Sequence, residues 1–86
     1  MYEIEIKRSA EKSLSKIPTG KHEKIKDRID SLAQNPFPHD CKKLKKITDE
    51  PQYSIRAGDN RVIYEVYDEK LLILVVKVGH RKEVYR

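Results

Sequence analysis

The fold is decided by residues 52–86, which read QYSIRAGDNRVIYEVYDEKLLILVVKVGHRKEVYR. Alternating apolar and polar residues predict one strand over 53–57 and a second over 61–67. The intervening residues 58–60, with the sequence GDN, are expected to form a hairpin loop, because glycine and asparagine accept a positive φ at low cost. The almost continuously apolar run 71–78 predicts a strand covered on both faces, which we place centrally in the sheet.

Arginine recurs where these strands begin and end, and Gly79 is expected to terminate the last of them. Strands are normally built from apolar and β-branched residues. Guanidinium groups repeated at strand ends therefore need a partner, and a polyanion is the natural one. The side chains that we expect on one common face are Arg56, Arg61, Arg81 and Tyr85.

The first half of the chain begins with a strand and a short helix. Residues 2–7 alternate as YEIEIK, which is typical of a half-buried strand. Ser9 is a candidate N-cap for a helix whose apolar stripe contains Ala10, Leu14 and Ile17. Proline at position 18 is expected to end this helix.

A second helix is expected from its cap at Thr19 to about Gln34, where the sequence NPFP ends it. Phe37 is expected to fold back onto the core, and Leu44 to anchor a short extra strand. The order β-α-α-β-β-β predicts an α+β fold with a helical hairpin packed on a mostly antiparallel sheet. We expect one domain over residues 1–86.

Composition narrows the choice of function. The 86 residues carry a formal net charge of +5, which favours an anionic partner such as nucleic acid, an acidic protein segment or a membrane surface. A single cysteine, Cys41, excludes a disulfide within the chain and fits a reducing cytosol. The apolar run 71–76 is too short to span a bilayer, and the three histidines are too dispersed for a metal signature. We therefore expect a cytoplasmic protein without membrane association, metal or cofactor.

Two motifs in this region resemble those of a known family. The arrangement Y-x-I-R-x-G-D-x-R-V-I-Y-E-V begins at Tyr53, and V-x-V-G-H-R-K-E-V-Y begins at Val76. Together with the two predicted helices ahead of them, they resemble the RelE/ParE toxin superfamily of toxin–antitoxin systems. The resemblance implies a RelE-like fold and an endoribonuclease that cleaves mRNA in the ribosomal A site. Cleavage would proceed by attack of the 2′-hydroxyl on the adjacent phosphate, without a metal.

The resemblance also implies roles for individual residues. Arg61 would stabilise the phosphate, Arg81 would act near the leaving 5′-oxygen, and Tyr85 would orient or deprotonate the nucleophile or stack on a base. Arginine suits the first two roles because it stays charged and can hold phosphate through two donors. Arg56 would add a phosphate contact from the preceding strand.

The chain departs from the family pattern at the proton acceptor. Well-studied RelE enzymes have lysines on the strand that carries residues 53–56, whereas this chain has Gln52 and Ser54 at those positions. The candidates that could replace the missing base are His80 and the lysines of the basic connector. The connector lysines that we also expect to contact RNA are Lys43, Lys45 and Lys46.

Other interpretations remain open from the sequence. A ParE-like inhibitor of DNA gyrase shares the fold, and a catalytically degenerate member would only bind an antitoxin. Arg61 has a structural alternative, an ion pair with Asp59 or Glu65, and Tyr85 has one in C-terminal packing. All of these functions imply a cognate antitoxin with an acidic, amphipathic segment, and the ribonuclease adds the ribosome and mRNA as partners.

Overall fold

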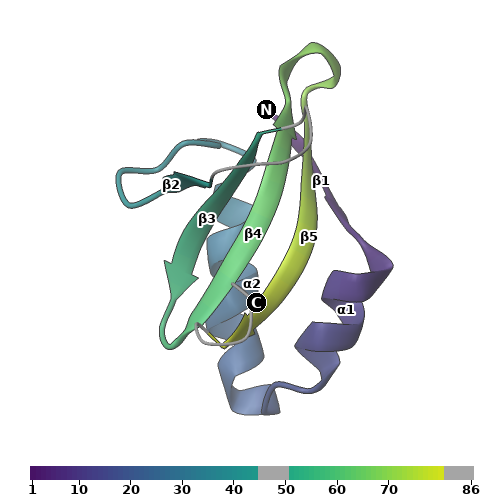
Figure 1. The fold of residues 1–86 in the computed structure, drawn as a ribbon, viewed down its shortest axis with the longest axis vertical. Helices are drawn as coiled ribbons and strands as arrows, with labels where there is room; N and C mark the ends of the chain where they lie inside the picture. The colour runs from purple at the N-terminus through teal and green to yellow at the C-terminus, as the bar shows by residue number, and fades with distance from the viewer. Residues whose placement is uncertain (45–50, 81–86) are drawn as a thin grey trace.

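The structure is a computed structural model and describes residues 1–44 and 51–80. In this part of the chain, two α-helices pack on one face of a five-stranded sheet of order β1-β5-β4-β3-β2 (Figure 1). The elements are β1 (Glu3–Ile6), α1 (Arg8–Ser15), the 3₁₀ turn η1 (Thr19–Lys21), α2 (His22–Ser31), β2 (Lys42–Leu44), β3 (Gln52–Ala57), β4 (Asn60–Tyr67), the 3₁₀ turn η2 (Asp68–Lys70) and β5 (Leu72–His80).

The sheet is antiparallel except at one edge. β1 pairs with β5 in parallel, whereas β5, β4, β3 and β2 pair antiparallel to one another. The α+β class, the helical hairpin on a mostly antiparallel sheet and the extra strand at Leu44 are thereby confirmed. The middle position belongs to β4, and β5 lies beside it between β4 and β1. The apolar run of β5 fits an interior strand equally well, so periodicity alone could not distinguish these positions.

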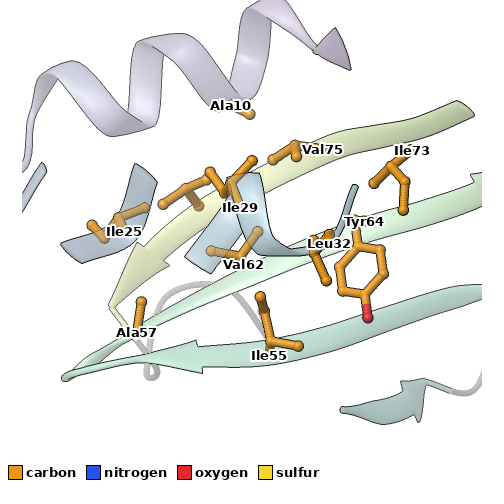
Figure 2. Packing of buried hydrophobic residues seen from close by; sticks show 11 residues of the cluster. Ala10, Ile25, Ile29, Leu32, Ile55, Ala57, Val62, Tyr64, Ile73 and Val75 are labelled. Carbon is orange, nitrogen blue, oxygen red and sulfur yellow. The ribbon is translucent and has the colours of Figure 1, made fainter. Parts of the chain in front are cut away.

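The core lies between the helices and the sheet. Figure 2 shows Ala10 of α1, Ile25 and Ile29 of α2 and Leu32 at the end of α2 beside the side chains of β3, β4 and β5. Tyr64 is fully buried there, and its hydroxyl donates a hydrogen bond of 2.7 Å to the Pro36 carbonyl. Burial raises the pKa of this hydroxyl, so it remains a donor. The buried core residues are Ala10, Ile25, Ile29, Leu32, Ile55, Ala57, Val62, Tyr64, Ile73, Val75 and Val78.

Both predicted helix caps were wrong. Ser9 lies inside α1, and its hydroxyl donates 3.1 Å to the Val76 carbonyl of β5. Thr19 begins η1 rather than α2, and neither helix has a side-chain cap. Serine and threonine can bond to any nearby carbonyl, so a tertiary partner on β5 replaces the local role that the sequence suggested for Ser9.

Two further local predictions were wrong. Phe37 is 44% exposed and packs edge-on against Tyr53, with ring centroids 5.0 Å apart, outside the core. Gly79 does not end β5, because it pairs with Arg61 inside the β4–β5 ladder. Tyr64 is the aromatic residue that is fully buried, and its hydroxyl holds the carbonyl of Pro36, the residue before Phe37.

The β3–β4 hairpin is tighter than its three-residue prediction. Asn60 already pairs with Ala57, which leaves a loop of only Gly58 and Asp59. Gly58 has φ +65°, a conformation that glycine adopts without the steric cost of a side chain. This short loop fixes the register of the whole hairpin.

We expect Ile29→Ala to lower the free energy of unfolding by about 2–5 kcal/mol, because it leaves a cavity between α2 and the sheet. Lys26→Ala, an exposed change on the same helix, should alter it by no more than about 0.5 kcal/mol. Urea denaturation measures both. Equal effects of the two variants would contradict the position of the core.

Candidate functional site

Two arginines face each other on the sheet surface that points away from the helices. Ile55 and Ala57 of β3 face the core, so Arg56 between them faces the opposite side. The same alternation places Arg61 of β4 on that side, and the ladder pairs it directly with Arg56. Like charges directly opposite each other are destabilising, so an anionic ligand would stabilise this pair of arginines.

Arg61 is unusually buried for an arginine. Only 8% of its surface is exposed, and its Nε has no hydrogen-bond partner within the described part of the chain. It forms no ion pair there with Asp59 or Glu65, the structural alternatives suggested by the sequence. A buried donor without a hydrogen-bond partner is destabilising, which is an unusual environment for a guanidinium group.

Both arginines line a depression of about 420 Å³. Arg61 is buried and forms its floor, whereas Arg56 is exposed at its rim. Lys42 stands opposite Ser54 in the β2–β3 ladder and therefore shares the face of the arginines. We call this site the arginine depression, and the described residues that line it are His39, Asp40, Cys41, Lys42, Arg56 and Arg61.

Residues 38–41 form a turn that lines the depression and is held against β3 by hydrogen bonds. The Cys41 backbone N–H donates 2.9 Å to the Pro38 carbonyl and closes the turn. Arg28 of α2 holds both oxygens of Asp40 at 2.7 Å, and its Nε donates 3.1 Å to the Arg56 carbonyl. One guanidinium therefore joins the turn, α2 and the strand that carries Arg56.

This guanidinium also controls the charge of the depression. The hydrogen bonds from Arg28 lower the pKa of the Asp40 carboxyl, and the opposite charge adds to the effect. Asp40 therefore stays ionised but paired. Because its negative charge is matched by Arg28, the charge offered to a ligand comes from Lys42, Arg56 and Arg61.

The structure brings some of the predicted site residues together and separates others. Arg56 and Arg61 meet in the arginine depression, but Lys43 pairs with Tyr53 and lies on the helix-facing side of β2. His80 pairs with Asn60, so the ladder places it on the face opposite Arg61. The roles expected for Lys43 and His80 stay predictions.

His80 lines a different depression, of about 400 Å³, between the end of α1 and the end of β5. Three lysines line it as well, from the C-cap of α1, from η1 and from β5. This second basic site was not predicted, because it combines residues that are far apart in the sequence. Its basic lining residues among those described are Lys16, Lys21, Lys77 and His80.

Gln52 and Ser54, which stand where the family pattern has lysines, are engaged elsewhere in the structure. Gln52 Nε2 donates 2.9 Å to one oxygen of Glu65, and the Tyr67 hydroxyl donates 2.6 Å to the other. Ser54 is fully buried. None of these arrangements offers an exposed basic nitrogen on the strand.

Four predicted residues lie outside the described part of the chain, and their roles also stay predictions. Within residues 1–44 and 51–80, no three His, Cys, Asp or Glu side chains gather closely enough to hold a metal ion. No helix in those ranges has the length and apolar character needed to cross a membrane. The four residues are Lys45, Lys46, Arg81 and Tyr85.

Sequence reasoning missed His39 and Lys42. Lys42 sits in the run of lysines from which we selected Lys43, and only the register of β2 shows which of the two shares the arginine face. His39 follows Pro38 in an irregular segment without periodicity, so nothing local indicated its neighbours.

The Arg28–Asp40 ion pair predicts a specific pH dependence. Because the native pKa of Asp40 is lowered, the pair stabilises the protein above the ordinary pKa of aspartate, about 3.9, and this stabilisation is lost as the pH falls through the native value. We expect Asp40→Asn to cost less than about 1 kcal/mol at pH 7, because both side chains are partly exposed.

Urea denaturation of wild type and Asp40→Asn over a series of pH values tests this expectation. The difference in free energy of unfolding should disappear in acid. A difference that grows as the pH falls would show that Asp40 does not act through its charge.

Comparison with known proteins places the chain in a family. The model of the ParE toxin of the type II toxin–antitoxin system, parDE, matches residues 4–85. The mRNA interferase toxin RelE of Escherichia coli K12 is 28% identical over 86 residues, covering 98% of this chain and 90% of the relative.

Solved structures agree with this match. The RelE–RelB complex from Pyrococcus horikoshii OT3 shares 29% identity and a TM-score of 0.81, covering 96% of this chain and 98% of that chain. The RelB–RelE antitoxin–toxin complex from Methanococcus jannaschii shares 26% identity and a TM-score of 0.70, covering 93% of each. Since the family match spans nearly the whole sequence, this chain belongs to the ParE toxins of type II toxin–antitoxin systems, within the RelE/ParE superfamily.

Proposed function

We propose that this toxin is an endoribonuclease that cleaves mRNA on the ribosome, in the cytoplasm. The observation that carries the proposal is the buried Arg61, which lines the same depression as the exposed Arg56. Relatives that carry the name mRNA interferase RelE support the same activity at 28% identity.

The proposed reaction involves the RNA, the protein and water. The 2′-hydroxyl attacks the adjacent phosphorus, a bond from O2′ to phosphorus forms, and the bond from phosphorus to O5′ breaks. The proton of the 2′-hydroxyl leaves to a base, and the departing 5′-oxygen gains a proton from water. Arg61 would donate to a phosphate oxygen, where charge accumulates in the transition state. Arg56 and Lys42 would hold the same or a neighbouring phosphate at the rim.

We also propose a cognate antitoxin as a partner. Two similar solved structures are complexes of RelE with RelB. The net charge of +5 and the exposed Arg56 and Lys42 favour an acidic antitoxin segment. Such a segment could cover the arginine depression and exclude RNA from it.

Inhibition of DNA gyrase is the second candidate function. It is favoured by the matching family model, which describes ParE toxins, and by the absence of lysine at Gln52 and Ser54. On that interpretation the arginine depression would bind an acidic surface or DNA rather than the reacting phosphate.

We expect Arg61→Ala to reduce mRNA cleavage by about 10²–10³-fold, as is usual when one donor to a transition-state oxyanion is removed. Arg8→Ala, an exposed arginine of α1, is the matched control and should cleave like wild type. Primer extension on mRNA in a purified translation reaction measures both. Intact mRNA with the wild-type toxin, together with blocked gyrase supercoiling, would overturn the ribonuclease in favour of the second candidate.

Binding to mRNA-programmed ribosomes should weaken steeply with salt, because phosphate contacts release counterions. Replacing Arg56 by alanine should reduce the slope of log affinity against log salt by about 1. Filter binding at a series of KCl concentrations measures the slope. An unchanged slope in Arg56→Ala would remove this side chain from the phosphate contacts.

A further inference from the structure

The proposed reaction requires a proton acceptor, and the strand positions that carry lysines in well-studied RelE enzymes do not provide one. Ser54 is fully buried, and Gln52 is hydrogen-bonded to Glu65. The acceptor must stand close to the phosphate held by Arg61, within hydrogen-bond reach of the attacking hydroxyl. Among the described residues, the candidates for this acceptor are therefore those that line the arginine depression.

Three of the lining residues are poorly suited to accept the proton. Asp40 is occupied on both oxygens by Arg28. Cys41 packs against the core and lies beside the Tyr64 hydroxyl. Lys42 shares the face of the two arginines, where its ammonium group suits a phosphate contact.

His39 has the chemistry and the exposure that the other residues lack. A neutral imidazole has one nitrogen that accepts a proton and one that donates, and histidine is the most frequent general base in enzymes. His39 is exposed and lines the same depression as Arg56 and Arg61. Its imidazole can therefore be reached by an RNA strand that lies on the arginines.

The position of His39 is built into the fold. It sits inside the turn that the hydrogen bond from Cys41 to Pro38 closes. The next residue, Asp40, is held at two points by Arg28, which also binds the Arg56 carbonyl. These bonds fix the backbone on both sides of His39 relative to the strand that carries Arg56.

We propose that His39 is the proton acceptor of the cleavage reaction and that Arg28 is its positioning residue, an inference that rests on the proposed ribonuclease function. The imidazole takes the proton of the 2′-hydroxyl as the bond from O2′ to phosphorus forms, and it returns that proton to water after the 5′-oxygen has left. The charged and titratable groups that surround it are Asp40, Cys41, Lys42, Arg56 and Arg61, with Arg28 behind Asp40.

The test is single-turnover cleavage of mRNA on programmed ribosomes between about pH 5 and 8.5, the range that contains histidine titrations. We expect the wild-type rate to rise with pH, and His39→Ala to cleave about 10²–10⁴-fold more slowly and to lose that rise. Added imidazole should restore part of the rate to this variant. Arg28→Ala should cleave more slowly but keep the rise with pH and show no rescue.

Two controls separate the possible failures. Lys26→Ala, exposed on α2, should match wild type, and ribosome binding by His39→Ala should be unchanged, which shows that the variant is folded. Wild-type rate and pH profile in His39→Ala would overturn the role of His39 while leaving the ribonuclease intact. Loss of the pH dependence in His80→Ala instead would assign the role to His80. Absence of cleavage by wild type would overturn the proposed function itself.

Discussion

The register of the β3–β4 hairpin is the constraint on which the rest of the structure depends. The two-residue loop at Gly58 and Asp59 pairs Ala57 with Asn60, and this pairing sets Arg56 opposite Arg61. A shift of one residue would exchange the faces of the strand and turn an arginine into the core. The unfavourable pair of like charges is therefore held in place by the apolar residues on the other face, mainly Ile55, Val62 and Tyr64.

The sheet separates two kinds of surface. One face is closed by α1 and α2 over the apolar core (Figures 1 and 2). The other face carries the arginine depression. Asn60 and Arg61 are adjacent in β4 but face opposite sides of the sheet. Asn60 lines the second basic depression, and Arg61 lines the arginine depression. The end of the sheet near the β3–β4 loop is thus basic on both faces, which fits a protein that approaches a large polyanion.

Much of this arrangement could be predicted from the sequence, because alternation and apolar stripes are local signals. They indicated the strands of the last third, the helical hairpin and the common face of Arg56 and Arg61. The hydrogen bond of Ser9 to β5 and the packing of Phe37 on Tyr53 escaped prediction because they depend on residues distant in the sequence. The parallel pairing of β1 with β5 was not predicted for the same reason.

The candidate site was less predictable than the fold. Strand periodicity predicted that Arg56 and Arg61 share a face. His39, however, belongs to an irregular turn whose position is set by the ion pair of Arg28 with Asp40. An ion pair between a helix and a turn leaves no pattern in the sequence. The same limit applies to Lys42, whose side of the sheet follows only from the register of a three-residue strand.

We expect the buried Arg61 guanidinium, which lines the arginine depression, to donate to the phosphate that is cleaved. The most direct measurement is the structure of the toxin on a ribosome whose A-site codon carries 2′-O-methyl groups, which block the attack. We predict a phosphate oxygen about 2.7–3.2 Å from a nitrogen of the Arg61 guanidinium, in the arginine depression beside His39. A codon bound on another face of the sheet, with no phosphate near Arg61, would contradict it.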